Sequence, residues 1–215
     1  MNKITKIAII AIVATTISLT ANAQENRGIG VQAGLNFSSF SGIIQSLFPY
    51  NSEFSAVPGI QFGLISETQI GNSNWSLMSN ILYSNLGGRV ELTQTRFLRT
   101  ETERATLNVN VVMIRGHIQN SLPINNELSF AWHTGLHVGY SLWASYSYER
   151  IVNGVVVSTD GDAFLGTALN RATDIGVGLG IALIFQDRFR FGLGYDLGIL
   201  THNLSISVAY MLPRR

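Results

Sequence analysis

A two-residue period runs through most of this chain and separates large apolar side chains from small or polar ones. Between residues 128 and 142, the even positions are apolar or aromatic except Thr134, and the odd positions hold only Ser, Ala, His and Gly. Successive side chains of a β-strand point to opposite faces, so this period predicts strands with one apolar face. The pattern predicts eight strands, covering about 28–38, 58–68, 75 to beyond 83, 105–119, 128–148, 172–185, 189–200 and 204–212.

The connections between the predicted strands alternate in length. Those at 70–74, 120–126 and 186–188 are short, those at 39–57, 86–104 and 149–171 are long, and the last, 201–203, is short. Bacterial outer-membrane barrels have short periplasmic turns and longer external loops. Two long connections also carry strand signals, because Arg89 to Leu92 still alternates and Asn153-Gly154 is a hairpin sequence. The first long connection is apolar (Ile43, Ile44, Leu47, Phe48) and either folds over the barrel mouth or packs against its rim.

The composition of the two faces predicts which solvent each one meets. In five of the eight strands, the apolar face has one polar side chain, Thr134, and the opposite face has two large apolar ones, Ile184 and Met211. A soluble barrel carries charges outside, yet charged residues are only 13% of this chain, about half the usual share. An eight-stranded barrel has little room inside for bulky side chains. The predicted fold is therefore an all-β, eight-stranded antiparallel up-and-down transmembrane β-barrel, with a soluble two-sheet sandwich as the alternative.

The third and fourth strands follow the pattern less regularly. Met78, Leu82, Val112 and Ile114 fall on the predicted inner face, and Arg115 and His117 fall on the lipid-facing side. We place Arg115 and His117 at the periplasmic end of their strand, where an arginine can extend its charge to the interface. The aromatic residues suited to interfacial girdles are Trp75, Trp132, Tyr140, Tyr195 and Tyr210.

The first 23 residues have the features of a secretory signal peptide. Lys3 and Lys6 form a positive start, an apolar core follows, and Ala21-Asn22-Ala23 is a cleavage signature. We therefore predict a cleaved segment 1–23 and one barrel domain, 24–215, with an N-terminal membrane anchor as the alternative. The chain has no cysteine, which excludes disulfides and thiol catalysis, and its net charge of +1 gives no indication of nucleic-acid binding.

Several segments resemble the PorT-like family of outer-membrane β-barrel proteins of Gram-negative bacteria. The matching segments are Gly30 to Asn36, Gly59 to Leu64, Ile81 to Ser84 with Gly87-Gly88, Gly135 to Tyr140, Gly176 to Gly180 and Tyr195 to Gly198. The resemblance implies an eight-stranded barrel in the outer membrane and little about activity, although the namesake takes part in protein secretion. One departure is the C-terminus, because the last strand ends in Met211-Leu212 rather than in the aromatic residue read by the assembly machinery.

Ionisable residues on the predicted inner face are candidates for a polar network inside the barrel. They are Glu67, His133, His137, Asp174, Arg190 and Asp196. His133 and His137 lie about 13 Å apart along one strand, too far to share a metal ion, so we interpret the set as structural and expect no metal, cofactor or catalytic residue. Ser129 or Ser141 is a nucleophile in the enzymatic alternative, but no Gly-x-Ser-x-Gly turn is present. Asp160-Gly161-Asp162 is interpreted as a turn, with weak cation binding as the alternative.

The sequence thus predicts a non-enzymatic outer-membrane protein that acts through its external loops or as a secretion or assembly component. A narrow channel for small solutes is the first alternative, and a membrane-embedded lipid hydrolase or protease is the second. The expected partners are outer-membrane lipids, the barrel-assembly machinery and other envelope or secretion proteins, with no nucleic acid.

Overall fold

The computed structural model describes residues 27–41, 45–46, 52–96, 99–153, 155–159 and 172–212. The predicted signal peptide, the apolar residues of the first long connection and Asp160 to Asp162 lie outside the described residues. The strands are β1 (Arg27–Phe40), β2 (Ser52–Ser55), β3 (Val57–Gln69), β4 (Trp75–Arg96), β5 (Arg99–Pro123), β6 (Leu128–Val152), β7 (Val155–Thr159), β8 (Thr173–Phe185), β9 (Phe189–Gly198) and β10 (Thr201–Met211). Within the described part of the chain, no helix has the length and hydropathy to cross a membrane.

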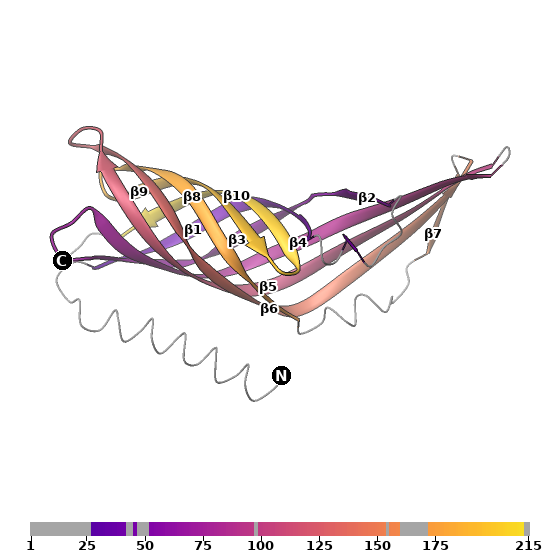
Figure 1. Cartoon of the computed structure of the whole chain (residues 1–215), viewed down its shortest axis with the longest axis horizontal. Coiled ribbons are helices and arrows are strands. Elements are labelled where there is room, and N and C mark those ends of the chain that lie inside the picture. The colour runs from indigo at the N-terminus through magenta and orange to yellow at the C-terminus, as the bar shows by residue number, and fades with distance from the viewer. Residues whose placement is uncertain are drawn as a thin grey trace, which may run out of the picture.

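Eight of the strands form a closed antiparallel ring in the order β1-β3-β4-β5-β6-β8-β9-β10 (Figure 1). The ring closes where β1 pairs with β10, with Gly30 opposite Met211 and Phe40 opposite Thr201. Closure matters because lipid offers no hydrogen bonds, so every backbone N–H and C=O in the membrane needs a partner within the protein. The predicted up-and-down barrel is confirmed, and β2 and β7 are additional strands outside the ring.

The side chains divide between the two faces of the ring as the alternation predicts. Leu136 and Leu179 on the outside are 65% and 60% exposed, whereas Asn36 on the inside is fully buried. The same division holds along β1, β8, β9 and β10, where exposed large apolar residues alternate with buried or half-buried small and polar ones. An apolar outer surface of this extent has to be covered by hydrocarbon, since water solvates it poorly.

The prediction for β5 was wrong in its facing. Arg115 and His117 are only 5% and 4% exposed and lie inside the barrel. Val112 and Ile114 lie opposite Tyr140 and Val138 of β6, on the outer face. The sequence assigned the two faces of β5 the wrong way round. A barrel interior accepts a charge when another strand supplies the counter-charge, and the sequence of β5 alone does not show that partner.

Three strands continue far beyond the barrel. β4, β5 and β6 have 22, 25 and 25 residues, whereas the other five strands of the ring have 10 to 14. Figure 1 shows them leaving the barrel together, with β2 paired along β4 and β7 paired along β6. We call this five-stranded extension, made of β2, 85–96, 99–110, 143–152 and β7, the projecting sheet. It confirms the predicted continuation of the strands, including a turn at Asn153, whose φ is 48°.

The projecting sheet and the short turns lie at opposite ends of the barrel. The turns at 70–74, 124–127 and 186–188 join strands at one end, and the extension leaves from the other (Figure 1). Short turns are periplasmic in bacterial barrels, so the projecting sheet belongs to the external end. The β9–β10 turn at residues 199–200 also lies at the external end and is short.

Candidate functional site: the lumen and the projecting sheet

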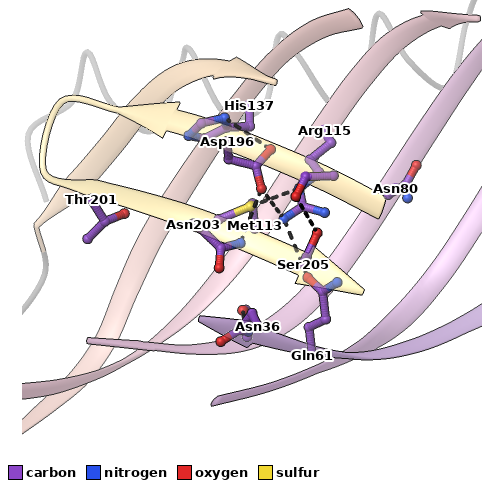
Figure 2. Close-up of polar contacts among 12 residues, drawn as sticks. Asn36, Gln61, Asn80, Met113, Arg115, His137, Asp196, Thr201, Asn203 and Ser205 are labelled. Atoms are coloured by element: carbon purple, nitrogen blue, oxygen red, sulfur yellow. Dashed lines mark hydrogen bonds and ion pairs between the residues drawn. The ribbon is translucent and has the colours of Figure 1, made fainter. Parts of the chain in front are cut away.

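The middle of the lumen is held by a buried ion pair that joins two distant strands. Arg115 Nη2 of β5 lies 2.6 Å from Asp196 Oδ2 of β9, and Asn203 Nδ2 of β10 donates to the same oxygen at 3.2 Å. Figure 2 shows these side chains converging with His137, whose Nδ1 is 3.9 Å from Asp196 Oδ1. Gln61 Oε1 accepts a longer contact from Arg115 at 3.4 Å. The ring is therefore cross-linked through its interior.

A second ion pair lies nearer the periplasmic end. Arg190 Nη2 is 3.2 Å from Glu67 Oε2, joining β9 to β3. Glu67 Oε1 also accepts hydrogen bonds from Ser76 Oγ at 2.8 Å and Gln119 Nε2 at 3.0 Å. A part-buried carboxylate with a basic partner and two donors is well satisfied, and removing its arginine leaves a poorly solvated charge.

A small polar cavity lies between these two ion pairs. It has a volume of about 50 Å³ and is lined on one side by His117 and His133, whose rings are 5.0 Å apart between centroids. Neither ring nitrogen of His117 has a hydrogen-bond partner within the described protein, and the same holds for Nδ1 of His133. A polar cavity of this size holds a few water molecules, which would satisfy these atoms.

The external end of the lumen is apolar instead. Phe40, Leu86, Leu107, Val109, Val111 and Met113 form a buried cluster, and Phe54, Ala144, Tyr146 and Leu200 pack against it. The buried members of this cluster come from β1, β4 and β5, on the external side of the polar layer. Water that moves between the polar layer and the external mouth would therefore meet apolar side chains.

The structure places all six predicted lumen residues in the barrel but divides them into separate groups. Glu67 pairs with Arg190, Asp196 lies near His137, and Asp174 stands apart near the external end. Sequence reasoning missed Arg115, His117 and Gln61. The sequence did contain a signal for Arg115. An arginine that faces lipid in mid-strand is energetically costly, and placing its side chain inside the barrel avoids that cost.

No enzymatic or metal-binding constellation is found among the described residues. No group of three or more His, Asp or Glu side chains there has the geometry to hold a metal ion. The hydroxyl of Ser141 has no hydrogen-bond partner in that part of the chain, so no imidazole activates it.

Polarity inverts on both faces of β4, β5 and β6 where they leave the barrel. Outward residues of the barrel are mostly apolar, through Tyr83 of β4 and Val112 of β5, and become polar beyond them. The polar outward residues are Asn85, Arg89, Glu91, Thr93, Thr102, Arg104, Thr106, Asn108, Ser145, Ser147 and Glu149. Inward residues change in the opposite direction. They include polar Asn80 and Arg115 in the barrel and apolar Leu86 and Leu107 where the strands leave it. The outer face therefore meets hydrocarbon along the barrel and water along the projecting sheet.

Aromatic side chains mark both edges of the lipid-facing belt. Tyr83 contacts Phe62 and Trp143 at the external edge, and its hydroxyl donates to Asn110 Oδ1 at 2.6 Å. Trp75 and Trp132 pack together at the periplasmic edge, 5.4 Å between ring centroids. Residues 132 and 143 of β6 are about 36 Å apart along the strand; at a tilt of about 45° this spans about 25 Å of membrane.

Ion pairs cross the strands of the projecting sheet. Arg104 of β5 contacts Glu91 of β4 and Glu149 of β6, and Arg150 of β6 contacts Glu101 of β5. The hydrogen bond to Glu91, together with the charge of the two carboxylates, raises the pKa of Arg104. Paired charges of this kind keep the projecting sheet soluble and nearly neutral.

Residues 22–202 match a sequence model of a protein family described as an outer membrane protein beta-barrel domain. The chain belongs to this family. The protein is accordingly an outer-membrane protein embedded in outer-membrane lipids. A search of curated proteins found no match.

Solved structures of outer-membrane barrels are similar to this chain in fold. The attachment invasion locus protein Ail of Yersinia pestis is 12% identical, with 87% of this chain and 99% of Ail covered and a TM-score of 0.33. Neisserial surface protein A is 9% identical, with 85% and 96% covered and a TM-score of 0.39. The porin KdgM is 8% identical, with 84% and 99% covered and a TM-score of 0.23.

Proposed function

We propose that this protein is a non-enzymatic surface-binding protein whose barrel is the anchor and whose projecting sheet is the binding element. The observation that carries the proposal is the extension of β4, β5 and β6 beyond the aromatic belt, with a polar outer face. A plain anchor needs strands only long enough to cross the membrane. The extra length supports a role outside it.

The edges of the projecting sheet favour a polypeptide partner. Among the described residues, β2 pairs only with β4 and β7 pairs only with β6, so each strand has an open edge. β7 reads Val-Val-Val-Ser-Thr, without charge or proline, and Val155 and Val156 are exposed. Proteins normally protect such edges, and an unprotected one accepts an extended strand from another chain.

Selection of peptides on the protein tests this function. A random peptide library would be panned against the protein in nanodiscs and counter-selected against a barrel in which short turns replace 88–106 and 146–159. We expect enriched peptides rich in β-branched residues, whose binding is lost when alternate backbone amides are N-methylated. Peptides that bind the shortened barrel equally well, or no enrichment at all, would refute the proposal.

The filled lumen argues against the channel alternative. The apolar cluster around Leu86 and Val109 lies on the external side of the polar layer and disfavours a continuous wet path there. We further propose that residues 1–23 are removed on export and that the barrel-assembly machinery inserts domain 24–215. Kinship with the PorT-like family and a part in secretion remain predictions.

A further inference from the structure

The outer face of the projecting sheet separates its charges by height above the lipid-facing belt. Three rows of outward residues begin at the aromatic edge: Asn85 and Asn110 beside Trp143, then Gly87, Asn108 and Ser145, then Arg89, Thr106 and Ser147. We call these three rows the membrane-proximal band. The carboxylates of Glu53, Glu91 and Glu149 lie together in the next row out, with Arg104. Among its described residues, the membrane-proximal band therefore has no carboxylate, and its one charge is that of Arg89.

Arg89 differs from the other arginines of the projecting sheet whose side chains are described. Arg104 and Arg150 each contact a carboxylate, whereas no Asp or Glu oxygen of the described chain lies within 4.0 Å of Arg89. Its Nε donates to Thr106 Oγ1 at 3.2 Å, and this is its one side-chain hydrogen bond within that part of the chain. The threonine thus holds the guanidinium on the sheet and leaves the four N–H groups of Nη1 and Nη2 available.

The position of Arg89 along β4 corresponds to the depth of lipid headgroups. Asn85 is level with Trp143 of the aromatic edge, because both are paired with Asn110, and Arg89 follows four residues later. Four residues span about 13 Å along a strand, or about 9 Å along the membrane normal at a tilt of about 45°. The polar layer on each side of the hydrocarbon is about 5–8 Å thick. The long side chain of an arginine covers the remaining distance, so Arg89 reaches the headgroups of the external leaflet.

We infer that the membrane-proximal band binds the phosphorylated headgroup of a lipid in the external leaflet. A guanidinium with both Nη groups available donates two parallel N–H···O bonds to a phosphate. Asn85 and Asn108 are half-buried and Ser145 is exposed, and their neutral side chains supply donors and acceptors for headgroup hydroxyls. The phosphate meets no like charge before the row of Glu91. The inference concerns the wall above the lipid belt and does not rest on strand addition to the projecting sheet.

The test is native mass spectrometry of the refolded protein in a non-ionic detergent, which measures the lipid that the protein retains. The probe is diphosphoryl lipid A, and the comparison lipid has the same acyl chains and sugars without phosphates. We expect the phosphorylated lipid to be retained at least about fivefold better, the effect of one arginine near anionic headgroups. Inorganic phosphate at the same concentration should not displace it. Equal retention of the two lipids, or displacement by free phosphate, would overturn the inference.

Variants separate the site from a general charge effect. Arg89→Gln should lower retention of diphosphoryl lipid A about fivefold and leave retention of the dephosphorylated lipid unchanged. Arg188→Gln removes the same charge from the exposed turn between β8 and β9 and should leave both unchanged. If Arg89→Gln does not fold, as judged by heat-modifiable gel mobility, Thr106→Val replaces it and should lower retention at least about twofold, because the guanidinium loses its support. Unchanged retention in the folded site variant, or an equal loss in Arg188→Gln, would also overturn the inference.

Discussion

Loss of the Asp196 carboxylate should destabilise the barrel strongly, because it strands a guanidinium inside the lumen. Arg115 Nη2 is 2.6 Å from Asp196 Oδ2, and both side chains are buried. In Asp196→Asn, Gln61 Oε1 at 3.4 Å and Met113 Sδ at 3.1 Å remain beside the charge. Removing one member of a buried pair costs about 3–5 kcal/mol. Water in the adjacent cavity offsets part of this, so we expect a loss of about 3 kcal/mol.

Urea unfolding in phosphatidylcholine vesicles, followed by tryptophan fluorescence, measures this cost. The double variant Arg115→Met/Asp196→Asn removes both charges and should recover most of the loss, with a coupling energy of at least about 2 kcal/mol. Glu101→Gln breaks the pair with Arg150 in the projecting sheet, where water screens the charges, and should cost no more than about 1 kcal/mol. A cost below about 1 kcal/mol for Asp196→Asn, or no recovery in the double variant, would refute the buried pair.

Three further measurements test the membrane placement and the closed lumen. Leu136→Arg puts a charge into hydrocarbon and should cost about 2–4 kcal/mol in the same unfolding assay; a loss within error of zero would contradict the outward facing. Tyr83→Phe removes the hydrogen bond to Asn110 and should cost about 0.5–1.5 kcal/mol; an unchanged or raised stability would mean that this bond is absent. In planar bilayers, the protein should insert without stepwise conductance, whereas Leu86→Ala/Val109→Ala should admit water; regular openings by the wild type would disprove the apolar closure.

The local pattern of the sequence is enough to predict most of the barrel. Alternation of large apolar and small polar residues fixes strands with two distinct faces, and the shortage of charge indicates which face meets lipid. Thr134, the one polar residue in the apolar row of β6, does not disturb this reading. The projecting sheet was also partly predictable from the sequence, because the alternation continues through Arg89 to Leu92 and a hairpin sequence follows β6.

The same pattern could not predict the contacts inside the ring. Arg115 and Asp196 are 81 positions apart and meet only because closure and the stagger of the strands bring β5 and β9 to the same height in the lumen. The alternation within β5 put Arg115 on the wrong face, because its counter-charge lies on another strand and cannot be recognised from the sequence of β5.

Sequence therefore determined the eight strands of the ring and, except in β5, the solvent on each face, because these depend on neighbours along one strand. The tertiary structure decided which charges pair, which arginine of the projecting sheet is left without an acidic partner among the described residues, and which strands border the projecting sheet. Those features depend on register between strands, and register is a property of the closed ring rather than of any single segment.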